Sequence, residues 1–249
     1  MPAVSDSRAP GSASRQPGAD RAAEVSWFDV RDVTLGPADL TDLDVRETAR
    51  AAAFVYPADR HRYQAAHVML RRVLAGHLGS EPGRLVFARE PCPTCGGPSG
   101  KPVLASQEAP VPAFSLAHSG DVVAIAVAGR PVGVDVEREA TGCVCSLITA
   151  MHPSDAAVVE PLPEPERHAA VIRWWVRAEA VLKCAGTGIG HGLDAFPVLG
   201  GPAPDEASPP ARPLYVPGWA DAAGCSFAPL SAPEGYQAAI ALPGRRALP

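Results

Sequence analysis

Two helical segments constrain the fold of this chain more than any other feature of its sequence. From Asp59 onward, apolar and aromatic residues recur at the 3.6-residue spacing of an amphipathic helix, and Gly79 ends the pattern. A second, longer helix is expected over residues 167–185, closed by Gly186. The other regular patterns are short and strand-like, so the sequence predicts an α+β fold.

Short runs rich in β-branched and aromatic residues supply the strands. The expected strands are residues 25–35, 84–88, 113–116, 121–128, 131–137, 213–216, 225–230 and 236–242. Ser154 is expected to cap a short helix that stops before the proline-rich residues 161–165, and residues 197–213 form a loop rich in proline and glycine. Residues 1–23 lack periodicity and are expected to be a disordered tail.

The chain also contains a weak internal repeat. Val123-Ala124-Ile125-Ala126 and Ala238-Ala239-Ile240-Ala241 place similar strands 240 − 125 = 115 residues apart. A strand, a helix and further strands recur in a similar order on each side of residue 130. The expected organisation is two related α+β halves, residues 24–130 and 131–245, after the tail.

Charge and hydropathy exclude several classes of protein. The chain has 22 Lys and Arg against 27 Asp and Glu, a net charge of −5, which argues against general nucleic-acid binding but leaves room for a local basic pocket. No apolar run approaches the roughly 18 residues of a membrane-spanning helix, and the N-terminal residues lack the apolar segment of a secretory signal. We therefore expect a cytoplasmic protein whose six cysteines are reduced.

Paired carboxylates end the strand at residues 131–137. Side chains alternate along a strand, so Gly133, Asp135 and Glu137 share one face, opposite three valines. Two carboxylates on one face can reach a single Mg²⁺, and Gly133 leaves room for a ligand to approach. The alternative is a strand end with two solvated acids.

A second pattern lies on the longer helix. Trp175, Glu179 and Lys183 follow one another at four-residue intervals and share one helix face. An exposed Glu179–Lys183 ion pair is the alternative interpretation, although the tryptophan indicates that this face is partly covered.

Two further segments suit an anionic ligand. Residues 114–120 run from a strand into a glycine turn, where the backbone with His118 and Ser119 could hold a phosphate; an ordinary turn is the alternative. Six arginines lie between residues 46 and 72, and Lys101 beside a proline could join the same pocket; a solvated helix face is the alternative. They are Arg46, Arg50, Arg60, Arg62, Arg71 and Arg72.

Cys92 and Cys95 have half the spacing of a zinc knuckle, but no second ligand pair follows within reach. We interpret them as a loop feature, with a structural metal as the alternative.

Together, Gly133-Val134-Asp135-Val136-Glu137 and Trp175…Glu179-Ala180…Lys183, about forty residues apart, resemble the signature of the 4′-phosphopantetheinyl transferase superfamily. The length and the Phe114–Gly120 segment resemble its surfactin-type (Sfp-like) branch. The resemblance implies a pseudo-twofold pair of α+β halves with the active site between them. It also implies transfer of the phosphopantetheine arm of coenzyme A to a serine of an apo acyl or peptidyl carrier protein, with release of 3′,5′-ADP.

The resemblance further implies residue roles. Asp135, Glu137 and Glu179 would bind Mg²⁺, with Mn²⁺ as a substitute, and Lys183 would neutralise the pyrophosphate. Glu179, directly or through a water on the metal, would accept the proton of the carrier serine. Coenzyme A would be bound by Arg50, Arg62, Lys101, His118 and Ser119.

Some positions depart from the family pattern: Ala117 precedes His118 where many members have serine, and Ala178 precedes Glu179 where many have lysine. A monomer acting in polyketide or non-ribosomal peptide biosynthesis is expected. One alternative is a non-catalytic module that binds coenzyme A or a carrier protein. Another is a different Mg²⁺-dependent phosphotransferase, but no P-loop is present.

Overall fold

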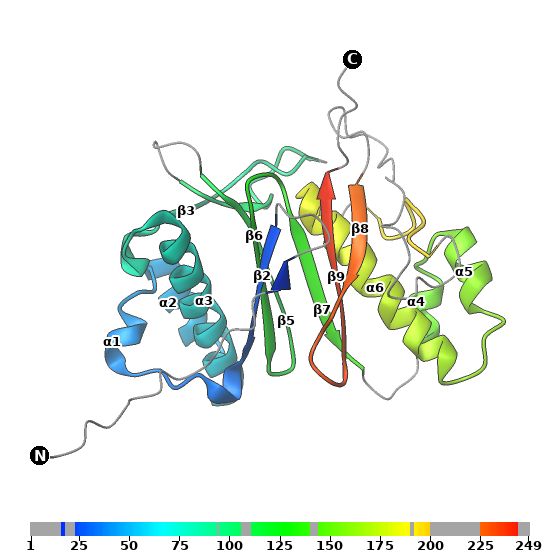
Figure 1. Cartoon of the computed structure of the whole chain (residues 1–249), viewed down its shortest axis with the longest axis horizontal. Coiled ribbons are helices and arrows are strands. Elements are labelled where there is room, and N and C mark those ends of the chain that lie inside the picture. Colours follow the sequence, from blue (N-terminus) through cyan, green and yellow to red (C-terminus); the bar gives the residue numbers. More distant parts are fainter. Residues whose placement is uncertain are drawn as a thin grey trace, which may run out of the picture.

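The computed structural model describes residues 16–17, 23–93, 95–105, 111–139, 144–189, 192–199 and 225–243. It is a mixed α/β fold, with helices on both sides of two central antiparallel sheets (Figure 1). The expectation of a fold that combines helices with short strands is confirmed. The predicted strand at 213–216 and most of the predicted tail lie outside the described residues; Gln16–Pro17 pair with the next strand.

Each sheet places its last strand in the middle. The first sheet has the order β1-β2-β6-β5 and the second the order β7-β9-β8. The strands of the first are β1 (Gln16–Pro17), β2 (Ala23–Asp29), β5 (Ala113–Ser119) and β6 (Val122–Ala128); those of the second are β7 (Gly133–Arg138), β8 (Cys225–Leu230) and β9 (Tyr236–Pro243). A separate ladder joins β3 (Phe87–Arg89) to β4 (Pro102–Leu104). Leaving β1 aside, the strand that comes last in the sequence lies in the centre of each sheet: β6 lies between β2 and β5, and β9 lies between β7 and β8.

Two long helices, α3 (Pro57–Leu78) and α6 (Glu166–Ala185), carry most of the helical residues described. They end at Gly79 and Gly186, whose φ angles of 61° and 76° lie in the left-handed region that favours glycine. Both predicted ends are confirmed. The shorter helices are α1 (Pro37–Leu40), α2 (Val45–Ala52), α4 (Cys145–Ile148) and α5 (Pro153–Val159), with single 3₁₀ turns η1 (Val30–Asp32) and η2 (Pro82–Arg84).

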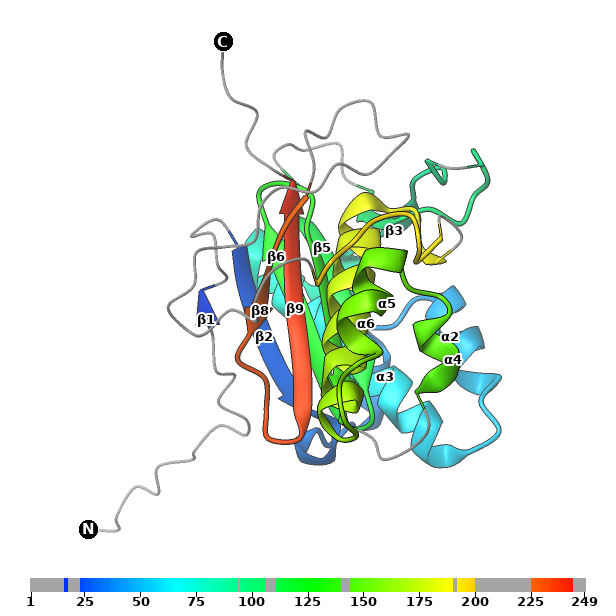
Figure 2. The same cartoon turned by 90° about the vertical axis from the view of Figure 1, so that its right-hand side faces the viewer.

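Three apolar clusters fix the order of the layers. Leu74 of α3 packs with Ile125 of β6 on the outer face of the first sheet. Val25 of the first sheet and Ile240 of the second belong to the cluster between the sheets. Trp174 of α6 packs on the outer face of the second sheet, along whose strands the helix lies in Figure 2. The layers are therefore helix, sheet, sheet, helix.

The two sheets meet at strands β5 and β7, where serine side chains take the place of a backbone ladder. The Ser115 hydroxyl accepts a hydrogen bond from the backbone N–H of Val134 at 3.0 Å. Four residues along, the Ser119 hydroxyl accepts from the N–H of Arg138 at 3.1 Å. This β5–β7 junction holds the edge strands of the two sheets side by side.

Several predicted boundaries were wrong, and local hydrogen bonds explain why. The strand expected over 25–35 ends at Asp29, because the Asp29 carboxylate accepts from the N–H of Arg31 at 2.9 Å and caps η1. The strand expected over 84–88 begins only at Phe87, after η2. His152, whose ring accepts from the N–H of Ser154 at 3.2 Å, caps α5 in place of Ser154.

Candidate active site

Strand β7 presents its carboxylates to helix α6, as the alternation predicted. Val134 and Val136 point into the cluster between the sheets. Asp135, which is 4 % exposed, points the other way and contacts α6 through Lys183. The alternative of two solvated acids is therefore wrong for Asp135.

Gly133 does not leave room for a ligand. A Cβ atom there would overlap the carbonyl oxygen of Ala180 and the backbone nitrogen of Cys184. The space beside Gly133 is filled by the backbone of α6, which corrects the expectation that a ligand approaches there. The glycine instead lets the helix lie close enough to β7 for their polar side chains to meet.

Lys183 forms its ion pair across to the strand. Its Nζ atom donates to Oδ1 of Asp135 at 2.6 Å. Glu179, one turn earlier on α6, is 9 % exposed. The interpretation of Glu179 and Lys183 as a solvated surface pair is therefore wrong.

Two buried carboxylate oxygens at this site have no hydrogen-bond partner in the described structure: Oδ2 of Asp135 and Oε1 of Glu179. Burial raises the pKa of Asp135 to about 7; the nearby charges of Glu179 and Glu137 add to the increase, and Lys183 opposes it. Burial also raises the pKa of Glu179, with Glu137 adding to the effect. Negative charge is thus concentrated where water is largely excluded.

This donor set fits a hard divalent cation in its chemistry, because unpartnered carboxylate oxygens are the ligands that Mg²⁺ prefers. In the described ranges, however, no three His, Cys, Asp or Glu side chains are arranged closely enough to hold a metal ion. Lys183 already neutralises one oxygen of Asp135. The site therefore contains carboxylates of the kind that bind a cation, and Lys183 forms an ion pair with one of them.

Ser119 lies at the same site but contacts a carboxylate. Its hydroxyl donates to Oε2 of Glu137 at 2.6 Å and so orients that side chain. The neighbouring His118 is exposed, and partial desolvation together with the positive charge of Lys183 lowers its pKa. The β5–β7 junction thus brings together five of the predicted residues, with His118 beside them: Ser119, Asp135, Glu137, Glu179 and Lys183.

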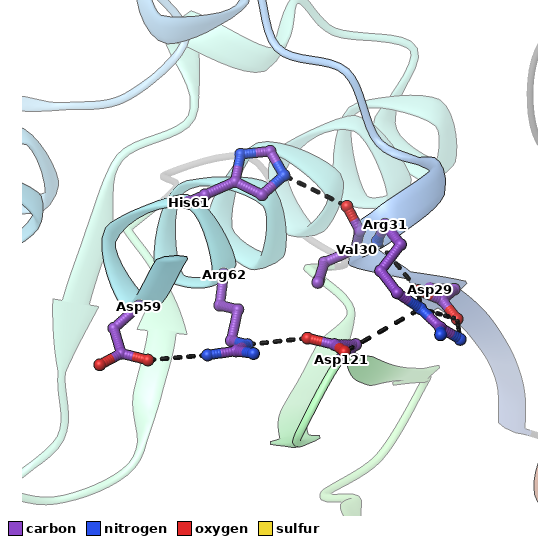
Figure 3. Close-up of polar contacts among 7 residues, drawn as sticks. All are labelled: Asp29, Val30, Arg31, Asp59, His61, Arg62 and Asp121. Carbon is purple, nitrogen blue, oxygen red and sulfur yellow. Dashed lines mark hydrogen bonds and ion pairs between the residues drawn. The ribbon is translucent and has the colours of Figure 1, made fainter. Parts of the chain in front are cut away.

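The predicted basic residues have other neighbours. On α3, Arg62 is held between Asp59 and Asp121 (Figure 3). The exposed Arg50 of α2 lies with its guanidinium 5.2 Å from the centre of the Phe54 ring. Lys101 donates to the carbonyl of Val132 at 2.6 Å, and burial lowers its pKa.

Arg71 does not belong to a ligand pocket. Its side chain is fully buried, and it donates to Glu47 and to the carbonyls of Pro82 and Leu85. Interactions with His67 and Arg71 outweigh the opposing effect of burial and lower the pKa of Glu47 to about 2. The interpretation of Arg71 as a ligand-binding cation is therefore wrong: it joins α3 to α2 and η2.

Sequence reasoning missed Ser115 and Asp121. Ser115 closes the junction, but one serine inside a strand carries no signal of that role. Asp121 follows the predicted phosphate-binding turn directly, so its position was a usable signal. Asp59 lies one helical turn before Arg62, a spacing typical of an ion pair.

The chain is similar to known proteins over the elements that carry this site. Residues 131–208, which include β7 and α6, match the 4′-phosphopantetheinyl transferase superfamily. The chain is 34% identical over 147 residues to the 4′-phosphopantetheinyl transferase HetI of Nostoc sp., covering 57% of this chain and 59% of that protein. It is 28% identical over 160 residues to the 4′-phosphopantetheinyl transferase psf-1 of Bacillus pumilus, covering 59% of this chain and 60% of that protein. Each match thus spans less than two thirds of the relative's length.

In the part of the chain that the structure describes, no helix has the length and apolar character needed to cross a membrane. The family match covers the strand and the helix that supply Asp135, Glu137, Glu179 and Lys183. Over residues 131–208, which include both elements, the chain is similar to the 4′-phosphopantetheinyl transferase superfamily.

Proposed function

We propose that this protein transfers the 4′-phosphopantetheine arm of coenzyme A to a serine hydroxyl of an apo acyl or peptidyl carrier protein, releasing 3′,5′-ADP. The observation that carries the proposal is the pair of buried, unpartnered carboxylate oxygens of Asp135 and Glu179 beside Lys183. The superfamily match over these residues supports it. A module that only binds coenzyme A has no need of buried carboxylates beside a lysine.

The transfer forms a bond from the serine oxygen to the β-phosphorus of coenzyme A and breaks the bond from that phosphorus to the bridging oxygen of the pyrophosphate. Glu179 accepts the serine proton. Lys183 turns from Asp135 to the leaving phosphate and neutralises the charge that develops there. These residues mainly position groups and balance charge, which is what phosphoryl transfer requires.

Asp135, Glu137 and Glu179 would hold a Mg²⁺ ion, which Mn²⁺ could replace. When bound, such an ion neutralises and orients the pyrophosphate. Ser119 fixes the Glu137 carboxylate through its hydrogen bond of 2.6 Å. In this proposal, coenzyme A is bound by Arg50, Arg62, Lys101, His118 and Ser119.

We further propose a surfactin-type enzyme that acts as a cytoplasmic monomer on carriers of polyketide or non-ribosomal peptide synthesis. The shared strand order of the two sheets supports a pseudo-twofold relation between residues 24–130 and 131–245. The two isoleucines of the sequence repeat are not equivalent positions in this arrangement, because Ile125 packs against α3 whereas Ile240 lies between the sheets.

The test is incubation of the purified protein with coenzyme A, Mg²⁺ and a panel of apo carrier proteins, followed by intact-mass spectrometry. A mass increase of one phosphopantetheine group on a carrier, abolished by EDTA and restored by Mg²⁺ or Mn²⁺, supports the proposal. Coenzyme A binding without a mass increase on any carrier would indicate the non-catalytic module instead.

A further inference from the structure

We propose that Asp121 is a positioning residue for coenzyme A, because it holds the guanidinium of Arg62 in the orientation that binds phosphate. The inference rests on the proposed function, in which Arg62 contacts coenzyme A. Asp121 lies in the turn between β5 and β6, two residues after Ser119.

Two carboxylates from different elements fix the Arg62 side chain (Figure 3). The Nε atom of Arg62 donates to Oδ1 of Asp121 at 2.8 Å, and its Nη1 atom donates to Oδ1 of Asp59 at 2.8 Å. A guanidinium is planar, so acceptors at two of its nitrogens set both its position and its plane. It carries five N–H donors, so the remaining ones are available to phosphate oxygens.

Asp121 is itself held firmly enough to act in this way. Its backbone carbonyl accepts from the N–H of Val30 at 2.8 Å, and its Oδ2 atom lies 3.9 Å from Nε of Arg31. The ring of His61, next to Arg62 on α3, lies 3.2 Å from the carbonyl of Val30. The turn, η1 and the start of α3 are thus connected by several polar contacts (Figure 3).

Two other residues assigned to coenzyme A lie next to this turn. His118 and Ser119 end β5, immediately before the turn. A carboxylate in this turn therefore sets the distance between Arg62 on α3 and the end of β5. Neither Arg62 alone nor Asp59, which shares its helix, can do this.

Removing the Asp121 carboxylate should change coenzyme A binding in opposite directions, depending on whether the residue acts through its charge or by positioning Arg62. Coenzyme A is polyanionic, so removing a nearby carboxylate should strengthen its binding if long-range charge dominates. If Asp121 acts by orienting Arg62, removing it should weaken binding. Asp29 is the matched control, because it belongs to the same network through Arg31 but does not contact Arg62.

The experiment is calorimetric titration of the full-length protein with coenzyme A, together with a double-mutant cycle. We expect Asp121→Ala to raise the Kd about tenfold, and Arg62→Ala to do the same. In the Arg62→Ala background, Asp121→Ala should change the Kd less than twofold. Asp29→Asn should stay within twofold of wild type, and the KM for coenzyme A should rise in Asp121→Ala while kcat stays within twofold.

An unchanged or lower Kd in Asp121→Ala would overturn the inference, as would a tenfold effect that persists without Arg62. Asp121→Asn, which keeps the acceptor at Oδ1, should show a smaller loss than alanine and serves as the test if the alanine variant does not fold. If the wild type and Asp121→Ala bind coenzyme A equally well, the proposed function stands and only the positioning role of Asp121 is rejected. Failure of the wild type to bind coenzyme A rejects both.

Discussion

At the residue scale, Glu179 gives the most direct test of the chemistry. Glu179→Gln keeps the size of the side chain but removes the charge and the base. We expect kcat to fall about 100- to 1000-fold, with the KM for coenzyme A changed only a few-fold, because the lost interactions act mainly on the transition state. Steady-state assays with one apo carrier measure both constants. The control is Glu166→Gln, an exposed position on the same helix, which should keep wild-type activity. If Glu179→Gln keeps more than about a tenth of the wild-type kcat, Glu179 is not the base.

Asp135 should make the stability of the metal-free protein depend on pH. Its pKa is about 7 in the folded protein, against 3.8 for an ordinary aspartate. Between these values the folded protein keeps a proton that the unfolded chain releases, so the free energy of unfolding falls as the pH rises through this window. We compare the free energy of unfolding of Asp135→Asn with that of the wild type. The difference, variant minus wild type, should increase by up to about 4 kcal/mol from pH 4 to pH 8.

Urea unfolding in EDTA at a series of pH values measures this difference. Asp194→Asn, at an exposed carboxylate, is the control and should track wild type across the range. A difference between Asp135→Asn and wild type that stays flat, or shrinks as the pH rises, would show that Asp135 is not held with a raised pKa.

Much of this chemistry could be predicted from single residues and their spacing. The alternation of strand side chains placed Asp135 and Glu137 on one face, and the four-residue spacing placed Glu179 and Lys183 together. The actual partner of Lys183 could not be predicted, because Asp135 is 48 residues away and reaches it only through packing. The hydroxyl of Ser119 was likewise expected to meet a phosphate, whereas in the structure it binds Glu137.

At the scale of elements, Gly133 decides how closely β7 and α6 approach. In Gly133→Ala the new Cβ would meet the helix backbone at Ala180 and Cys184, which cannot move aside as a side chain could. We expect the free energy of unfolding to fall by about 2–4 kcal/mol and kcat to fall with it, since Asp135 and Lys183 separate. Thermal and urea unfolding measure the first effect. Gly129→Ala, in the connection to β7 where no atom lies within 4 Å of a new Cβ, should change stability by less than about 1 kcal/mol; equal losses in both variants would contradict the close approach.

The elements themselves were predictable where the sequence carries local signals. Helical periodicity and a terminal glycine located α3 and α6 almost to the residue, and the predicted strand at 225–230 matches β8. Boundaries failed where a side chain competes for backbone groups, as Asp29 does at η1. The pairing of β7 with β9 could not be predicted, because a strand that follows β6 after a short turn would ordinarily pair with β6.

At the scale of the whole molecule, we expect the cluster between the sheets to make the two sheets unfold together. Ile240 of β9 is 1 % exposed and shares this cluster with Ala124 and Ala126 of β6, which belongs to the other sheet. Ile240→Ala should therefore lower the free energy of unfolding by about 2–4 kcal/mol, through the lost packing and the cavity left behind. Because both sheets share the cluster, the backbone amides of β6 and β9 should lose the same amount of protection against hydrogen exchange in this variant.

Native-state hydrogen exchange followed by mass spectrometry tests this, since the slowest amides of a cooperative domain exchange only by global unfolding. In wild type we expect the slowest amides of β6 and β9 to report equal opening free energies, and in Ile240→Ala both should fall by the same amount. Ile189→Ala, at a side chain that is 56 % exposed, is the control and should leave both strands unchanged. If β9 loses protection while β6 keeps it, each sheet is stabilised mainly by its own helix, and the cluster between the sheets contributes little to cooperativity.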